Sequence, residues 1–342
     1  MENLKLYNAS SLLPNKLNFY RKNSLAQKIR KDLLRLIIYK PQLENEKKNL
    51  VKKFEELTNT KFKSVNELLS YDFNDVFFNN LYREKITNKY KLNPSFESLE
   101  LIKLFEKINN DSLDIFVHGS HADGSKTNYS DLDVSIFINN KKNFNLNRIK
   151  NDILILNNYV KSIDLESHHS IFLNLRSDLN CYPESFMPIS VFNNSVTPKK
   201  QNKIIYRTRF STDIALDSFI RIYSSINNII LQNYNHNNFY NIKFIISSYF
   251  MLIILNYEII HMKFLDKKTI FKEFLLNKNN NKFLNIFNLC SEIRANWPNQ
   301  NGSTDIGISN HVFKEIHQHS KSMLEEIENS LSLKKTLEII LK

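Results

Sequence analysis

The sequence predicts an α+β protein in which a small mixed sheet stands between an N-terminal helical region and a C-terminal helical domain. Strand-like runs are confined to the middle of the chain, where short apolar or alternating segments follow one another. On both sides of this part, apolar residues recur at helical spacing. The 342 residues are enough for two or three domains. We therefore expect three parts, at residues 1–92, 93–197 and 198–342.

The N-terminal part is expected to be helical and basic. The segment LAQKIRKDLLRLIIYK places Leu25, Ile29 and Leu33 on one helix face. Pro41 interrupts this pattern, and LENEKKNLVKKFEEL resumes it. The basic residues between the apolar ones indicate either a solvated face or an arm that binds nucleic acid.

The middle part predicts an α/β unit. A helix over FESLELIKLFEKI follows Pro94 and Ser95 and precedes the apolar run LDIFVH. The segment DLDVSIFI then alternates as a strand does. A helix over LNRIKNDILILNNYV leads to two further strand-like runs, SIDLE and HHSIFLNL. Strand, loop, strand, helix and strand in this order predict a small mixed sheet.

The C-terminal part opens with the basic stretch TPKKQNKIIYRTRF and then reads as helical to the end. The residues STD at 211–213 are typical of a helix start. The most apolar window, FIISSYFMLIIL, has 12 residues. A membrane span needs about 20, so we expect a buried helix of a soluble protein without a membrane association. The further helices are expected at about 241–263, 268–276, 282–294 and 311–329.

Composition favours an anionic partner in a reducing compartment. The formal net charge is +12 and the pI about 9.4, which suits nucleic acid, a nucleotide or a membrane surface. Abundant Asn and Lys throughout the chain offer a compositional explanation for the same charge. Cys181 and Cys290 lack metal-ligand spacing and are expected to be free thiols. The first residues lack a signal-peptide apolar region, so we expect a cytoplasmic protein.

Two of the chain's four glycines fall close together in FVHGSHADGSKTNYSDLDVSIFI. Gly119 and Gly124 lie in the loop between two predicted strands. Glycine has no Cβ, so it permits positive φ and lets a ligand approach the backbone. A glycine-bounded turn with exposed amides is a natural phosphate cradle, and Ser120 and Ser130 add hydroxyl groups at either end of it.

Asp131 and Asp133 follow this loop with one residue between them. The period of two in a strand places both carboxylates on one face. Two like charges so close require a counter-charge, and hard oxygen ligands suit Mg²⁺ or Mn²⁺. A phosphate cradle beside a divalent-metal site predicts phosphoryl or nucleotidyl transfer.

This stretch resembles the active-site signature of the DNA polymerase beta-like nucleotidyltransferase superfamily, especially its minimal nucleotidyltransferases. An Asp stands at position 123, where many members have Arg, and this indicates weaker triphosphate binding or another substrate. The residues that match in type and spacing are Gly119, Ser120, Ala122, Gly124, Ser130, Asp131 and Asp133.

The resemblance also implies a third carboxylate on a later strand. Asp164, in Ile163-Asp164-Leu165, fits that position, Glu166 on the same strand face is an alternative, and Asp178 is a more distant one. The three acids would hold the metal ions, and Asp164 would orient or deprotonate an acceptor hydroxyl. The resemblance places a helical domain after the sheet, with Arg207 and Arg209 either contacting triphosphate or acceptor, or forming a solvated linker.

The following segment is similar to uncharacterised bacterial nucleotidyltransferase-like proteins, which carry paired histidines at this point. Here these are His168 and His169. With His118 and His121 they suggest a zinc site, although no Cys or HExxH pattern accompanies them. A phosphate or acceptor contact and simple strand packing are the other two interpretations.

The resemblance implies a metal-dependent enzyme that moves a nucleoside monophosphate from an NTP to an acceptor hydroxyl and releases pyrophosphate. The basic balance favours RNA, such as a tRNA end, in a toxin or defence setting. A protein hydroxyl, a small antibiotic or a second nucleotide would need the same acids. The competing hypotheses are an inactive, antitoxin-type module that binds nucleic acid or a protein partner, and a partner-held subunit with a blocked cleft.

Overall fold

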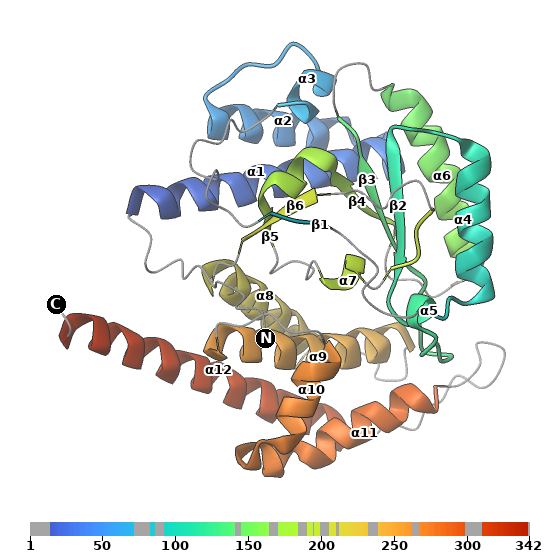
Figure 1. Cartoon of the computed structure of the whole chain (residues 1–342). Coiled ribbons are helices and arrows are strands. Elements are labelled where there is room, and N and C mark those ends of the chain that lie inside the picture. The colour runs from blue at the N-terminus through green and yellow to red at the C-terminus, as the bar shows by residue number, and fades with distance from the viewer. Residues whose placement is uncertain are drawn as a thin grey trace.

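The computed structural model describes residues 14–71, 83–85, 92–140, 145–163, 170–183, 190–193, 195–198, 205–209, 212–231, 239–261, 267–297 and 310–340. In this part of the chain, helices stand before and after a small mixed sheet, which confirms the predicted α+β class. Figure 1 shows the N-terminal helices α1 and α2 to the left of the upper part of the sheet and the C-terminal helices below it. Helices α4 (Phe96–Ile108) and α6 (Leu146–Ile163) lie along one side of the sheet.

The N-terminal region is built from α1 (Pro14–Tyr39), α2 (Glu44–Thr58) and α3 (Val65–Leu69). Pro41 lies in the turn between α1 and α2, because proline lacks the amide hydrogen that a continuing helix needs. Ser64 caps α3, since its hydroxyl accepts a hydrogen bond of 3.2 Å from the Glu67 amide. The predicted helices are therefore confirmed over residues 14–71, whereas Arg83–Lys85 form a strand, β1.

The central sheet has the strand order β2–β3–β4. β2 (Leu113–His118) pairs antiparallel with β3 (Asp133–Ile138), and β4 (Phe172–Leu175) runs parallel to β3. On the other side of β2, Val117 exchanges backbone hydrogen bonds of 2.9 and 2.7 Å with Val196. The prediction of a strand over SIDLE is wrong for its first two residues, because Ser162 and Ile163 are the last residues of α6.

The two faces of this sheet have different surroundings. Phe116, Phe137 and Phe192 of α7 (Ser190–Asn193) meet on one face, with ring centroids 5.1, 5.4 and 5.6 Å apart. Side chains alternate along a strand, so Asp133 lies on the same face as Phe137. The opposite face joins a hydrophobic cluster with α1, α4 and α6 through Leu113, Ile115, Val117, Val134, Ile136 and Leu173.

A second small sheet was not expected from the sequence. It has the order β1–β6–β5 and consists of β1 (Arg83–Lys85), β5 (Tyr182–Pro183) and β6 (Ile205–Arg209). β6 belongs to the basic stretch after Pro198, which the sequence presents as a junction rather than a strand. Its antiparallel partner β1 precedes the central sheet in the chain, so the pairing joins segments far apart in sequence.

From Thr212 onward the described part of the chain is helical, as predicted. Its helices share a second hydrophobic cluster, in which Tyr249 and Phe250 are fully buried. The structure also contains two short 3₁₀ helices, η3 (Arg176–Cys181) and η5 (Lys278–Phe283). The long helices are α8 (Thr212–Leu231), α9 (Phe239–His261), α10 (Lys267–Leu276), α11 (Leu284–Ala295) and α12 (Asn310–Ile340).

Helix α9 is the apolar helix that the sequence singles out. Among the described helices, it is the one whose length and composition would let it cross a membrane, over Tyr240–His261. In the structure it packs between the other C-terminal helices and contributes Ile246, Tyr249 and Ile253 to their core. Helix α9 is therefore a core helix of the C-terminal part, in agreement with the predicted buried helix.

A buried ion pair joins the N-terminal region to the segment after β4. Arg30 Nη2 on α1 donates to Asp178 Oδ1 on η3 at 2.6 Å, and the two side chains are 2% and 1% exposed. Arg30 Nη1 also donates to the Tyr71 carbonyl at 2.8 Å. The carboxyl group of Asp178 is therefore committed to a structural contact.

Removing one member of this pair should destabilise the fold strongly. We expect Arg30→Met to lower the free energy of unfolding by about 3–5 kcal/mol, because it leaves the Asp178 carboxylate buried without its counter-charge. The double variant Arg30→Met/Asp178→Leu should recover most of this loss. Urea unfolding followed by circular dichroism measures both.

The exposed pair Lys52–Glu56 on α2 is the control, with an N–O distance of 3.8 Å and side chains 74% and 64% exposed. Lys52→Met should change the free energy of unfolding by less than about 0.5 kcal/mol. An equally small effect of Arg30→Met would contradict a stabilising role of the buried pair.

Candidate active site

The loop between β2 and β3 turns at Gly119. This residue has φ 70°, a value that favours glycine, and it starts the short helix α5 (Ser120–Asp123). A Cβ at position 119 would lie 2.7 Å from Asp133 Oδ2. Glycine is therefore required where the carboxylate of Asp133 is held against the backbone turn. The helical turn of α5 was not expected within the loop.

Gly124 ends α5 in the left-handed conformation, with φ 79°. A Cβ there would lie 2.8 Å from Asn93 Nδ2 and 3.1 Å from the Asn93 carbonyl oxygen. This glycine thus lets the loop pack closely against the segment before α4. Its predicted contact with nucleotide stays a prediction.

Asp131 and Asp133 have the alternation that the sequence predicts. Leu132 between them is 4% exposed and packs in the core, whereas both aspartates are half-buried. In the sheet, Asp133 stands opposite His118. The structure therefore brings two carboxylates to the start of β3, and that of Asp133 lies beside the Gly119 turn.

Lys243 of α9 reaches this point from the C-terminal domain. Its Nζ makes a short ion pair with Asp131 Oδ1, and its side chain is 3% exposed. The sequence patterns did not point to Lys243. The available signal was a lone lysine inside the most apolar helix, since a buried ammonium needs a counter-charge.

Tyr129 anchors the loop in the C-terminal helices. Its hydroxyl donates to the Lys243 carbonyl at 2.8 Å and lies 2.6 Å from Ser247 Oγ. Its ring meets Trp297 edge to face at 4.8 Å, and the guanidinium of Arg294 lies 4.9 Å from it. Burial raises the pKa of Tyr129 to about 12, so this hydroxyl stays protonated. Trp297 is part of this anchor.

The other side of the loop is fastened to the start of α4. The Ser95 amide and the Ser98 hydroxyl donate to the His121 carbonyl at 2.8 and 2.9 Å. Lys126 forms an ion pair of 2.5 Å with Glu97. Although burial opposes it, this pair holds the pKa of Glu97 at about 2. The loop is therefore attached to two different parts of the molecule.

The two predicted loop serines differ in their surroundings. Ser120 is the half-buried first residue of α5. Ser130 is used within the loop, because its hydroxyl accepts from the Thr127 amide at 3.0 Å and its own amide donates to the Thr127 carbonyl at 3.0 Å. Ser130 therefore shapes the turn that presents Asp131.

Asp123, at the position where the resemblance leads one to expect Arg, also has local partners. Its Oδ1 accepts from the Ser125 amide and hydroxyl at 2.9 and 2.5 Å, and Oδ2 lies 3.3 Å from Lys268 Nζ. Partial burial opposes ionisation, but these hydrogen bonds and Lys268 hold the pKa of Asp123 below its usual value. An anionic side chain at 123 is thus matched by a lysine of α10.

Lys267 and Arg294 add positive charge near the aspartates, and the sequence did not single them out. Desolvation and the nearby Arg294 lower the pKa of Lys267 to about 8, against the opposing charges of Asp133 and Asp123. Lys267 is exposed to solvent, so a ligand can reach its ammonium group. A lysine with these neighbours suits an anionic ligand.

The remaining predicted residues lie elsewhere. Arg207 and Arg209 are on β6, in the second sheet rather than beside β3, and their side chains are outside the described part of the structure. Asp178 is buried against Arg30. The residues of the segment 164–169 lie outside the described residues: Asp164, Glu166, His168 and His169.

The two described histidines of the suggested zinc site have different partners. His118 Nε2 lies 3.0 Å from Ser135 Oγ, within the aromatic face of the sheet. His121 Nδ1 lies 2.9 Å from Ser95 Oγ, and burial lowers the pKa of this imidazole. Both are buried and take part in packing.

The donor set fits a divalent cation in part. No group of three or more His, Cys, Asp or Glu side chains that could hold a metal is found within the described residues. Asp131 and Asp133 provide carboxylate oxygens, which Mg²⁺ and Mn²⁺ prefer. The Gly119 turn, where a Cβ would meet Asp133 Oδ2, keeps the second of these carboxylates in place.

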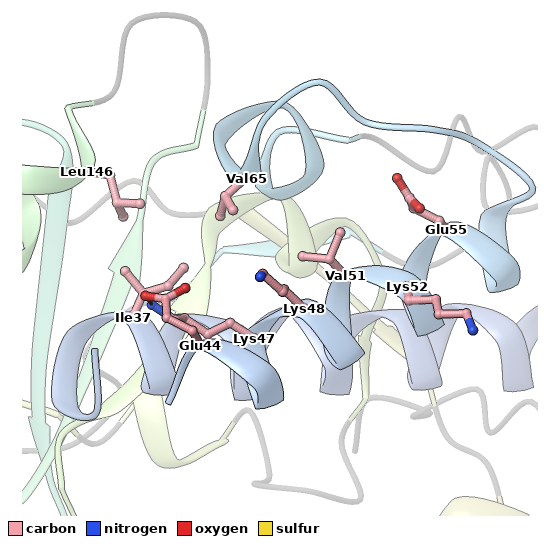
Figure 2. A pocket seen from close by; sticks show the side chains of 9 residues that line it. All are labelled: Ile37, Glu44, Lys47, Lys48, Val51, Lys52, Glu55, Val65 and Leu146. Carbon is pink, nitrogen blue, oxygen red and sulfur yellow. Dashed lines mark hydrogen bonds and ion pairs between the residues drawn. The ribbon is translucent and has the colours of Figure 1, made fainter. Parts of the chain in front are cut away.

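A groove of about 400 Å³ lies on the N-terminal helices, away from the aspartates (Figure 2). Figure 2 shows Val65 and Leu146 facing α1 and α2 across it. None of its lining residues belongs to the loop or to the C-terminal domain, so we do not place the reaction there. Its lining consists of Ile37, Glu44, Lys47, Lys48, Val51, Lys52, Glu55, Val65 and Leu146.

The middle of the chain is similar to a known protein family. Residues 99–193 match the family model of the nucleotidyltransferase domain, which confirms the resemblance of the signature. No curated protein and no solved structure matches the chain significantly. The matched segment includes β2 and β3, the glycine loop between them, and Asp131 and Asp133. Residues 99–193 of the chain are therefore similar to a nucleotidyltransferase domain.

Proposed function

We propose that the protein is a metal-dependent nucleotidyltransferase that moves a nucleoside monophosphate from an NTP to an acceptor hydroxyl and releases pyrophosphate. The observation that carries this proposal is the pair Asp131 and Asp133 at the Gly119 turn, inside the nucleotidyltransferase domain. Nucleotidyl transfer depends mainly on positioning and on neutralisation of charge. In this proposal, the glycine loop provides the positioning, and the two carboxylates with their bound ion provide the neutralisation of charge.

In this proposal, Asp131 and Asp133 hold Mg²⁺ or Mn²⁺. The bound ion offsets the charge of the triphosphate and favours deprotonation of the acceptor hydroxyl. The acceptor oxygen attacks the α-phosphorus, the bond to the pyrophosphate oxygen breaks, and the hydroxyl proton passes to a base. We assign the orientation or deprotonation of that hydroxyl to Asp164, following the family pattern.

Cationic side chains of the C-terminal helices suit the triphosphate better than the predicted arginines of β6. The charges of Asp133 and Asp123 raise the pKa of Lys267, so this lysine interacts electrostatically with both. Arg294 lies beside Tyr129 of the loop. Phosphate oxygens are strong acceptors for such donors. We therefore propose Lys267 and Arg294, together with Ser120, as nucleotide contacts.

We propose RNA, such as a tRNA end, as the acceptor, in a toxin or defence setting in the cytoplasm. The support is the net charge of +12, which attracts polyanions. Transfer of label from α-labelled ATP, CTP, GTP and UTP to RNA, to protein and to small hydroxyl compounds tests the acceptor. Salt-dependent RNA binding without transfer to any acceptor would instead support the inactive binding module.

Loss of either metal-binding carboxylate should abolish transfer. We expect Asp131→Asn and Asp133→Asn each to reduce label incorporation by at least about 1,000-fold, because each substitution removes the charge that holds the ion. Incorporation from the α-labelled NTP that the wild-type protein uses measures the effect.

Asp111→Asn is the matched control, since Asp111 is exposed in the turn at the opposite end of β2. It should leave incorporation within about two-fold of the wild type, as surface substitutions do. Full activity of the Asp131→Asn protein would contradict the assignment of the site.

Nucleotide binding should weaken at alkaline pH through Lys267. The pKa of this lysine is lowered to about 8, so its charge is present below pH 8 and is lost as the pH rises above it. We expect the Kd of a fluorescent NTP analogue to rise about 10-fold between pH 7 and pH 9.5, the effect of losing one charge-assisted contact. Fluorescence titration measures it.

Lys267→Arg should remove this pH dependence, because arginine stays charged. Lys272→Met, an exposed lysine on the same helix, should retain the wild-type profile. A wild-type Kd that does not change between these pH values would argue against a contact of Lys267 with the nucleotide.

A further inference from the structure

Lys243 contacts the carboxylate to which we assign metal binding. Its Nζ donates to Asp131 Oδ1, and the two side chains are 3% and 15% exposed. The two residues are 112 positions apart in the chain, and one belongs to α9 while the other follows the glycine loop. The pair is therefore a largely buried bridge between the C-terminal helices and the active-site loop.

This contact offsets two unfavourable charges. Asp131 and Asp133 place two half-buried carboxylates with one residue between them at the start of β3, and like charges at this spacing destabilise each other. A buried ammonium group also requires a counter-charge. The Lys243 ammonium neutralises the carboxylate of Asp131 and is neutralised by it.

A divalent cation at Asp131 competes with this ion pair. The cation needs the same carboxylate and repels the ammonium at short range. Lysine has a flexible four-carbon stem and three donors, so its head group can change partner. The phosphate oxygens of a nucleotide bound at this site offer it a new one.

We propose that Lys243 is a built-in counter-ion that keeps the metal affinity of the nucleotide-free enzyme low and turns to the triphosphate when an NTP binds. Metal and nucleotide then bind cooperatively, and each raises the affinity for the other by the same factor. This inference rests on the proposed function, because it assumes a nucleotide at the same site.

The position of the loop need not change during this exchange. The Tyr129 hydroxyl is held by the Lys243 backbone carbonyl and by Ser247, not by the lysine side chain. The movement is therefore confined to the side chain of Lys243, while Tyr129 keeps Asp131 in place.

The test is Mn²⁺ binding to the full chain without nucleotide, measured from the electron paramagnetic resonance signal of free Mn²⁺. We expect Lys243→Met to bind Mn²⁺ at least about 10-fold more tightly than the wild type, within the usual range of coupling between sites. A non-hydrolysable NTP should then increase the Mn²⁺ affinity of the wild type by a larger factor than that of Lys243→Met.

Lys268→Met is the matched control, because it removes a lysine of the same domain that pairs with Asp123 at 3.3 Å. It should leave Mn²⁺ affinity within about two-fold of the wild type, which separates a specific contact from a general loss of positive charge. Lys243→Arg keeps the charge and should resemble the wild type.

Equal Mn²⁺ affinities of the wild type and a folded Lys243→Met protein would overturn the inference and leave the proposed function standing. Absence of both Mn²⁺ and nucleotide binding to the wild type would overturn both. If Lys243→Met does not fold, wild-type crystals soaked with Mn²⁺ alone decide. Mn²⁺ on Asp131 with Lys243 still on the same carboxylate refutes the competition, and displacement of Lys243 by the ion supports it.

Discussion

The segment from Tyr129 to Leu132 belongs to two hydrophobic cores at once, and the candidate active site depends on this arrangement. Tyr129 is buried in the cluster of the C-terminal helices, and Leu132 is buried in the cluster of the sheet and the N-terminal helices. Ser130 and Asp131 alone lie between them. Each core contributes roughly 1.5–3 kcal/mol for a fully buried side chain of this size, so both ends of the segment are fixed. The carboxylate of Asp131 is thereby placed at the boundary of the two cores.

The glycines of the loop follow from the same constraint. A loop fastened at α4 on one side and at α9 on the other must pass close to other parts of the chain. Gly119 meets the carboxylate of Asp133, and Gly124 meets Asn93, at distances that a Cβ would not allow. Two of the chain's four glycines thus stand where neighbouring groups approach the backbone closely. A phosphate-binding role of this loop would use the same exposed turn.

Local patterns were enough to predict the strands around the loop and the helices of both flanking regions. Each of these depends on neighbours in sequence, such as alternation along a strand or the proline that ends a helix. Lys243 and the β1–β6 pairing could not be predicted in this way, because their partners lie far away in the chain. Asp178 shows the same limit, since its spacing allowed a catalytic role and only the fold reveals its pairing with Arg30.

The contacts that hold the loop differ in kind, and this difference determines what can move. Lys126 with Glu97 and Lys268 with Asp123 are partly exposed ion pairs, which contribute little stability and are weakened by salt. The ring of Tyr129, packed edge to face against Trp297, is buried and does not depend on charge. Binding of a polyanion beside the loop can therefore rearrange the ionic contacts at a small cost in free energy. Because the apolar contact persists, Asp131 keeps its position relative to the C-terminal helices while the lysines around it change partners.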